Sequence, residues 1–284
     1  MSSGSSFTIL PLSFKDRKPY EQFSDSWEED SLAFGASLEG EPVGLILAKK
    51  SPIIHTAEVL TVFVKQDHRQ KGIENALLQA LEHVLRKQKI QVVLFSYSEI
   101  GIEQVLHDLK WHSPRLHQIK CTFNGFEFNP PWLNRRYSIA QEFGIFPWSE
   151  LYPEEQQKLQ RLIEQKVIPH EISPFENEAT IEKSNSLGLR HKGSVVGWAI
   201  THRISPDTIR YSALYVKREF QHTGIAIKML CESIKLQQKA QIKWAILTVN
   251  VLTTEGSWLS FIEKRLVPYA QKVIYTKQAW KILE

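Results

Sequence analysis

The chain has 284 residues, of which 42% are hydrophobic and 23% are charged, and its formal net charge at pH 7 is +4. This length and composition are typical of a globular protein with two domains of ordinary size. The chain contains no run of about 18 apolar residues, which excludes a membrane-spanning helix. It also has no basic cluster interleaved with aromatic residues, so we expect neither a membrane nor a nucleic acid as partner.

Two features of the sequence predict a cytoplasmic protein. The first six residues form a polar leader without the basic and apolar regions of a secretion signal. The chain has only two cysteines, Cys121 and Cys231, one in each half. We expect both thiols to be free, as in a reducing compartment.

Hydrophobic periodicity predicts a first half that is rich in strands and contains one long helix. The expected strands are 7–14, 31–38, 42–49, 56–64, 91–97 and 118–126. The long helix follows a loop after Val64 and ends near Lys89, with its apolar residues on one face, and shorter helices are expected at 16–23 and 100–109. In this order of elements, the strand at 118–126 closes the first unit.

The segment 129–134 is predicted to be a linker, because its consecutive prolines end a strand and favour extended backbone. The same order of elements then returns, with a start at 143–149 that matches the start at 7–13. The expected helices are 154–167, 224–239 and 256–265, and the expected strands are 186–191, 194–203, 208–216, 242–250 and 269–280. The sequence therefore predicts two tandem domains, 1–134 and 135–284.

Each half contains a short loop between a strand and its long helix. The loop is Gln221-His-Thr-Gly-Ile-Ala226 in the second half and Arg69-Gln-Lys-Gly-Ile-Glu74 in the first, with the two glycines 152 residues apart (224 − 72). The first N–H groups of a helix have no intrahelical partner, and the helix dipole adds partial positive charge there. Such a loop suits a phosphate or pyrophosphate, and its glycine lets the backbone come close to the anion.

Gln221, Gly224 and Ala226 fill the three fixed positions of the pattern Gln/Arg-x-x-Gly-x-Gly/Ala, and through this motif and its repeat the chain resembles the GNAT N-acetyltransferase superfamily. The resemblance implies an α/β (α+β) fold of two tandem domains, each with a mixed, mostly antiparallel sheet flanked by helices. It also implies acetyl-CoA, or another acyl-CoA, as co-substrate. The residues that it assigns to the cofactor are Leu214, Tyr215, Val216, Gln221, His222, Thr223, Gly224, Ile225, Ala226 and Asn250. For Asn250, a plain strand-ending turn residue is the alternative.

The two loops differ at one position, where the first has Glu74 and the second has Ala226. A carboxylate in the first helical turn satisfies the helix dipole by itself, which contributes about 0.3–1 kcal/mol. It would also repel a pyrophosphate and occupy its space. Our hypothesis is that the first loop has become structural and that the second binds the cofactor. The alternative is that Glu74 points outward and the first loop still binds CoA.

The candidate residues for proton transfer are divided between the two halves. The acceptor amine must lose a proton before it attacks, because a lysine-like amine has a pKa near 10.4. By the resemblance, the base is a glutamate on the strand before the loop, which is Glu58 in the first half, whereas the second half has Arg210 there. The tyrosine that often serves as the acid is replaced by Leu106 and Ile262. Tyr215, Tyr211, Tyr269 or Tyr275 could replace this acid, and for each the alternative is a half-buried core tyrosine.

These features lead to a hypothesis of direct acetyl transfer, in a ternary complex, from acetyl-CoA to a primary amine of a small molecule or peptide. A non-catalytic acyl-CoA-binding or regulatory module is the alternative from another class, because the tyrosine is missing and the glutamate is displaced. Aminoacyl transfer from charged tRNA is a third hypothesis, which the lack of a basic groove disfavours. No metal site is expected, since the histidines at 107, 112 and 117 share no helical face. The sequence indicates neither the acceptor nor the oligomeric state.

Overall fold

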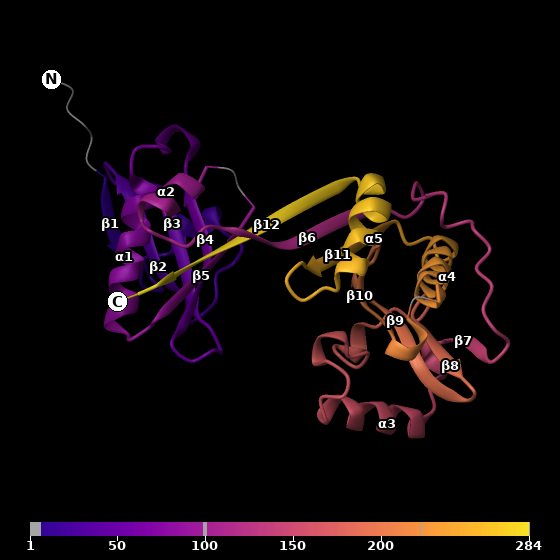
Figure 1. The fold of residues 1–284 in the computed structure, drawn as a ribbon. Coiled ribbons are helices and arrows are strands. Elements are labelled where there is room, and N and C mark those ends of the chain that lie inside the picture. Colours follow the sequence, from indigo (N-terminus) through magenta and orange to yellow (C-terminus); the bar gives the residue numbers. More distant parts are fainter. Residues whose placement is uncertain (1–6, 99–100, 222, 284) are drawn as a thin grey trace. The chain divides into compact units, whose positions relative to one another are not determined.

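The computed structural model describes residues 7–98, 101–221 and 223–283. Contacts within the chain divide it into two compact units (Figure 1). The N-terminal unit consists of residues 1–117 and 275–284, and the C-terminal unit consists of residues 118–274. The boundary predicted between residues 134 and 135 does not coincide with this division.

The sheet of the N-terminal unit has the strand order β1-β2-β3-β4-β5-β12. Its strands are β1 (Thr8–Pro11), β2 (Leu32–Leu38), β3 (Glu41–Lys50), β4 (Thr56–Val64), β5 (Val92–Tyr97) and β12 (Lys272–Ile282). The pair β4–β5 is parallel, and the other neighbouring strands in the described residues of this unit run antiparallel. The helices are a 3₁₀ segment (Lys18–Phe23), α1 (Ile73–Lys87) and α2 (Glu103–Asp108).

The sheet of the C-terminal unit has the strand order β6-β11-β10-β9-β8-β7. Its strands are β6 (Arg115–Asn124), β7 (Phe143–Pro147), β8 (Leu187–His191), β9 (Ser194–Ser205), β10 (Thr208–Val216) and β11 (Trp244–Asn250). Here β10–β11 is the parallel pair. The helices are α3 (Pro153–Glu164), α4 (Ile225–Lys239) and α5 (Gly256–Phe261), and α5 continues into a π-helical turn (Ile262–Leu266). The predicted α+β fold with mixed, mostly antiparallel sheet is confirmed.

Each half of the chain supplies the last strand of the other unit. The strand β6, from the first half, pairs with β11, and the end of β12, the last strand of the second half, pairs with β5 (Figure 1). The prediction that residues 118–126 close the first unit is therefore wrong. Alternation of apolar residues shows that a segment is a strand, but it does not specify which sheet edge the strand joins.

The repeat extends to the details of the backbone. The helices α1 and α4 both have 15 residues. In each unit the strand before the loop has one extra residue in its antiparallel ladder, Leu60 of β4 opposite β3 and Ser212 of β10 opposite β9. These two residues are 152 positions apart (212 − 60), the same offset as between the two glycines. A bulge of this kind bends the strand and ends its regular pairing. The two units therefore have corresponding bends just before their loops.

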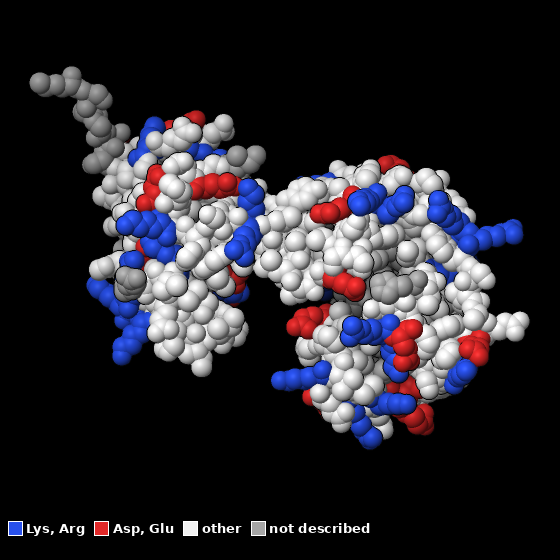
Figure 2. All heavy atoms as spheres, viewed as in Figure 1, with Lys and Arg blue, Asp and Glu red and all other residues white. Residues whose placement is uncertain are grey.

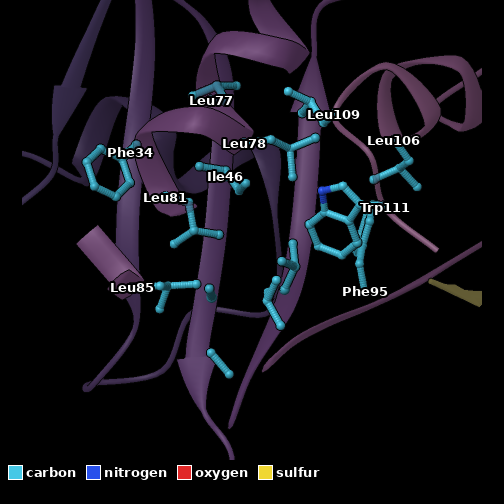
Figure 3. Packing of buried hydrophobic residues seen from close by; sticks show 14 of the residues in the cluster. Phe34, Ile46, Leu77, Leu78, Leu81, Leu85, Phe95, Leu106, Leu109 and Trp111 are labelled. Atoms are coloured by element: carbon cyan, nitrogen blue, oxygen red, sulfur yellow. The ribbon is translucent and has the colours of Figure 1, made fainter. Parts of the chain in front are cut away.

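The core of the N-terminal unit explains why α1 forms where it does. Its apolar residues recur every three or four positions, so Leu77, Leu78, Leu81 and Leu85 lie on one face and are almost fully buried. Figure 3 shows them against residues of the sheet, with Leu106, Leu109 and Trp111 beside them. The packed helix fixes the position of the loop that precedes it.

Most of the predicted elements are present, with three differences in detail. The segment expected as a helix at 16–23 is a 3₁₀ segment with a proline in its first turn. The helix expected at 100–109 is α2, which begins at Glu103, and residue 100 lies outside the described residues. The last segment forms one strand, β12, in which residues 272–282 are continuous. Cys121 and Cys231 are both free and buried, as the sequence predicted.

Charged side chains of both signs are interspersed over each unit on the face that Figure 2 draws. None of the helices within the described residues is both long and apolar enough to cross a membrane.

Candidate functional site

The predicted loop of the C-terminal unit joins β10 to α4. Gly224 is the N-cap of α4 and has a φ of +82°, a conformation that favours glycine. A Cβ at this position would meet nothing within 4 Å, so the φ angle, rather than crowding, requires the glycine. We call Gln221 and Thr223–Ala226 the C-terminal cradle; His222, also predicted to bind the cofactor, lies outside the described residues.

Several side chains of the C-terminal cradle hold the loop in place and leave its backbone for a ligand. Gln221 Nε2 donates to the Val216 carbonyl at 2.9 Å, and Thr223 Oγ1 donates to the Phe220 carbonyl at 2.7 Å. Ile225 is buried in the cluster beneath α4, and Ala226 packs against the same cluster. The first N–H groups of α4 have no intrahelical partner, so the cradle offers main-chain donors and partial positive charge to an anion.

The strand before the cradle separates from its parallel neighbour. Parallel pairing of β10 with β11 ends at Tyr211 opposite Leu247, while pairing with β9 continues from Ala213 to Val216. The backbone of residues 213–216 therefore has one edge directed away from β9 and outside the parallel ladder. Such an edge can pair with an extended ligand that carries amide groups.

The side chains predicted to line this edge have different environments. Leu214 packs into the α4 cluster, whereas the Tyr215 ring lies on the opposite face with its centroid 4.5 Å from that of Trp198. Burial raises the pKa of the Tyr215 hydroxyl, as does the nearby Glu219 carboxylate. Asn250 Oδ1 accepts a hydrogen bond from the Leu252 N–H at 2.9 Å, so the amide side chain stabilises the turn after β11.

The loop of the N-terminal unit has the same backbone. Gly72 is the N-cap of α1, with a φ of +82° and open space around its Cβ position. Arg69 Nε donates to the Val64 carbonyl at 3.1 Å, the counterpart of the bond from Gln221 to Val216. Parallel pairing of β4 with β5 likewise ends just before the bulge, at Val59 opposite Phe95. The predicted equivalence of the two loops therefore extends to their hydrogen bonds.

A cavity of about 390 Å³ lies where β4 and β5 separate. Glu74 and Arg69 are both among the residues that line it, so the first turn of α1 borders this space. The other lining residues are Leu60, Thr61, Val62, Val64, Gln70, Phe95, Ser96, Tyr97, Ser98, Gly101 and Ile102. We call this space the N-terminal cleft.

Tyr97 is a residue of the N-terminal cleft that sequence reasoning missed. It is 7% exposed, and among the described residues its buried hydroxyl has no hydrogen-bond partner. Burial, with a smaller contribution from the Glu103 carboxylate, raises the pKa of this hydroxyl to about 12. The sequence pattern marks Tyr97 as the end of a buried strand but gives no sign that its hydroxyl lacks a partner.

The candidate base Glu58 lies on β4 of the N-terminal unit, whereas the cradle and Tyr215 belong to the C-terminal unit. Glu58 is paired in register with Lys49 of β3. Lys49 Nζ forms an ion pair with Glu28 Oε1 at 2.8 Å, and the pKa of Lys49 is raised, first by this hydrogen bond and also by the charges of Glu28 and Glu58. Glu58 is therefore next to a cation.

The C-terminal unit holds a second arrangement that the sequence did not reveal. His202 of β9 is 4% exposed, and its Nδ1 lies 2.6 Å from Ser212 Oγ at the bulge of β10. Its Nε2 lies 2.8 Å from the Glu176 carbonyl oxygen. No sequence motif indicates this pair, because the two side chains meet only through the register of two strands. In the ranges that the structure describes, no group of three or more His, Cys, Asp or Glu residues could hold a metal ion.

A loop with left-handed glycine at a helix N-terminus, beside a parallel strand pair that separates, occurs in both units. Comparison with known proteins agrees with this repeat. Residues 6–99 match the sequence model of the Acetyltransferase (GNAT) family. No curated protein matches the chain.

Solved structures match the chain over almost its whole length. The GCN5-related N-acetyltransferase from Sphaerobacter thermophilus has a TM-score of 0.65 at 12% identity, with 98% of this chain and 96% of that one covered. A tandem GNAT protein from the clavulanic acid biosynthesis pathway has a TM-score of 0.59 at 10% identity, with 98% and 99% covered.

Residues 6–99 therefore match the GNAT acetyltransferase family, and nearly the whole chain has the fold of tandem GNAT proteins. The resemblance predicted from the two loops is confirmed.

Proposed function

We propose that this protein transfers an acetyl group, or another acyl group, from acyl-CoA to a primary amine of a small molecule or peptide. Transfer is direct and takes place in a ternary complex. The C-terminal cradle holds the diphosphate of the cofactor, and the open edge of β10 at Leu214, Tyr215 and Val216 pairs with its amide-bearing arm. Asn250, at the end of β11, lies on the opposite side of this arm.

One observation carries the proposal. In the C-terminal unit, Gly224 with its left-handed backbone opens a 15-residue helix just after β10 has left β11. Main-chain donors for an anion and an open strand edge for an extended chain are therefore neighbours. Ala226 adds neither charge nor bulk in the first turn, which favours an anionic ligand here.

We propose Tyr215 as the acid that protonates the departing thiolate. Its raised pKa supports this role in one respect, because the phenol keeps its proton at neutral pH. Its place on the open edge of β10 puts it next to the acyl end of the cofactor in the proposed binding mode.

The N-terminal cleft is a second candidate for the cofactor site. Two observations favour it, namely its volume of about 390 Å³ and the family match over residues 6–99. In this alternative, Glu58 is the base that deprotonates the amine. Against it stands Glu74, which is among the residues that line the cleft and adds a negative charge to the first turn of α1.

Release of CoA thiol from acetyl-CoA tests the activity in the full-length protein. We expect release above the rate of hydrolysis with at least one of a panel of small primary amines, such as glycinamide, ethanolamine and putrescine. Tight binding of acetyl-CoA without amine-dependent release would instead identify a non-catalytic acyl-CoA-binding or regulatory module.

A charge placed in the C-terminal cradle tests the location of the cofactor. Ala226→Glu puts a carboxylate in the first turn of α4, and we expect the affinity for acetyl-CoA to fall by more than about 1 kcal/mol through repulsion and lost space. The matched control is Ala240→Glu, the same substitution at the exposed C-cap of the same helix. Unchanged affinity in Ala226→Glu would show that the diphosphate is held elsewhere.

A further inference from the structure

The partners of His202 determine its tautomer. The Glu176 carbonyl oxygen can only accept, so the His202 Nε2 at 2.8 Å carries the proton. In the neutral ring Nδ1 is then an acceptor, and the Ser212 hydroxyl at 2.6 Å donates to it. Ser212 Oγ in turn accepts from Arg210 Nε at 3.2 Å, and its more distant contact with the Arg210 carbonyl, at 3.3 Å, competes poorly for the proton. A hydroxyl held by an imidazole that a third group orients is the arrangement of an activated oxygen.

The position of Ser212 gives this arrangement access to a substrate. Ser212 is the extra residue of the bulge, one residue beyond the end of the β10–β11 pairing and two residues before Leu214. Ser212 is partly exposed, whereas His202 is buried behind it. Its counterpart in the N-terminal unit, Leu60, lines the N-terminal cleft. Ser212 therefore lies at the point where the two parallel strands separate, and its hydroxyl is held by His202 of β9.

The two units carry related chemistry at one cross-strand position. In the N-terminal unit Lys49 of β3 is paired in register with Glu58 of β4, and in the C-terminal unit His202 of β9 is paired with Arg210 of β10. In both pairs a cation lies beside a group that can accept a proton. The proton acceptor lies on the bulged strand β4 in the N-terminal unit (Glu58) but on the neighbouring strand β9 in the C-terminal unit (His202). There, Ser212 links His202 to the bulge of β10 through a hydrogen bond.

We propose that Ser212 and His202 form the general-base relay of the C-terminal site, a proposal that rests on acyl-CoA being bound by the C-terminal cradle. The acceptor ammonium loses one proton to Ser212 Oγ while the Ser212 hydroxyl passes its own proton to His202 Nδ1. The neutral amine then attacks the thioester carbonyl carbon and forms the carbon–nitrogen bond. The carbon–sulfur bond breaks, Tyr215 protonates the thiolate, and the remaining extra proton on nitrogen returns to Tyr215 through water.

The imidazolium that forms is stabilised by its second partner. The His202 Nε2–H points at the Glu176 carbonyl, whose negative end favours the charged ring. The proton on His202 then passes to solvent, which resets the relay. His202 is thus a general base that acts through Ser212, and Ser212 is the group that touches the substrate.

Kinetics in the full-length protein separate this role from a structural one. With a primary amine at pH 7, we expect Ser212→Ala to lower kcat by about 10²-fold with the KM for acetyl-CoA unchanged. With hydroxylamine, which is already neutral at pH 7, the variant should match the wild type. His202→Gln should give the same pattern, and the double variant no further loss, because the two residues act as one unit. The matched control is Ser194→Ala at the exposed start of β9.

Two results of these kinetics overturn different claims. If the wild type releases no thiol with any amine, the proposed function fails and the relay fails with it. If amine-dependent release is present and equal in wild type and Ser212→Ala, the relay alone is overturned. An acetyl ester on Ser212, seen by mass spectrometry after incubation with acetyl-CoA, would also overturn it, since Ser212 would then be a nucleophile.

The tautomer of His202 tests the relay without any substrate. In the full-length protein labelled with ¹⁵N-histidine, we expect the His202 ring, assigned by its disappearance in His202→Gln, to carry its proton on Nε2. A proton on Nδ1 would mean that the ring donates to Ser212 and cannot accept its proton, which overturns the relay whatever the acceptor is.

Discussion

The two loops of this protein have the same backbone and different chemistry. Gly72 and Gly224 have the same φ of +82°, each opens a 15-residue helix, and in each loop a long side chain donates to the carbonyl of a valine at the strand end. The first turn of the helix, however, carries Glu74 in one unit and Ala226 in the other. The two loops therefore share their backbone geometry and local hydrogen bonds, while the charge in the first helical turn differs between them.

The units also differ in how they fix the strand that comes from the other half. In the N-terminal unit the buried Glu82 of α1 accepts hydrogen bonds from Trp111 Nε1, Arg86 and Lys281, the last from β12 at 2.6 Å. In the C-terminal unit the corresponding residue of α4 is Ile234, and β6 contributes buried apolar residues such as Ile119 and Phe123. In the N-terminal unit, hydrogen bonds to Glu82 therefore help to hold β12, whereas β6 contributes buried apolar side chains to the C-terminal unit.

The same substitution at the two loop glycines should show the largest difference between the two loops in their affinity for acetyl-CoA. Valine at a positive φ costs about 1–3 kcal/mol, so Gly224→Val should distort the C-terminal cradle and weaken acetyl-CoA by about 10²-fold. Gly72→Val imposes the same strain in the N-terminal loop, since neither glycine has a neighbour within 4 Å of its Cβ position, and should leave the affinity unchanged. Calorimetric titration measures both, and the reverse pattern would assign the cofactor to the N-terminal loop.

Lys281→Met tests how much the stability of the N-terminal unit depends on the contact between Lys281 of β12 and Glu82. It leaves the buried Glu82 carboxylate without its cation from β12, and we expect the free energy of unfolding to fall by about 3 kcal/mol. Lys277→Met is the matched control, because its ion pair with Glu103 is exposed and should contribute less than about 1 kcal/mol. Equal effects of the two substitutions in denaturant titrations would contradict the role of Glu82.

Some features of the two units could be predicted from the sequence, and others depend on contacts that form only in the fold. Strands, helices and both loops were predictable, because the periodicities of 2 and 3.6 and the turn residues are local signals. The exchange of β6 and β12 between the two units was not predictable, because the alternation of apolar residues does not specify which sheet edge a strand joins. Nor was the pairing of Ser212 with His202, which depends on a bulge that shifts the register by one residue. The hydrogen bond by which the Gln221 side chain fastens the loop to Val216 was likewise not predictable from the sequence.

Glu74→Ala should make the first loop more like the second. Removal of the carboxylate leaves the N–H groups of α1 free for an anion, and we expect the affinity of the N-terminal loop for acetyl-CoA to rise by about tenfold. The number of acetyl-CoA molecules bound per chain should increase from one to two in calorimetry. Glu74→Gln keeps the size and removes the charge, so it separates repulsion from lack of space. Two bound molecules in the wild type would contradict the structural role of Glu74.

Tyr97→Phe should have the smallest effect. It should stabilise the protein, whereas most substitutions that delete a hydroxyl destabilise it. The buried Tyr97 hydroxyl has no partner in the part of the chain that the structure describes, so its removal should raise the free energy of unfolding by about 1 kcal/mol. Tyr211→Phe deletes a hydroxyl that donates a hydrogen bond to Gln237 Oε1 at 2.9 Å, so this substitution should lower the free energy of unfolding. A loss of stability in Tyr97→Phe would show that this hydroxyl has a partner in the folded protein.

The pKa of Tyr97 gives the same variant a pH signature. Burial raises this pKa to about 12 in the folded protein, whereas a tyrosine in an unfolded chain has a pKa near 10. The unfolded chain therefore loses the proton first, and the stability of the wild type falls as pH rises from about 10 to about 12. Tyr97→Phe should lose less stability over this window, and equal losses would contradict the assignment.

A crystal of the full-length protein soaked with acetyl-CoA tests the central claim most directly. We expect density for the diphosphate at the first turn of α4, in contact with the backbone of Gly224, Ile225 and Ala226. The thioester should lie near Ser212, where β10 and β11 separate. Density for the cofactor beside Gly72 and Glu74, with the C-terminal cradle empty, would contradict the account.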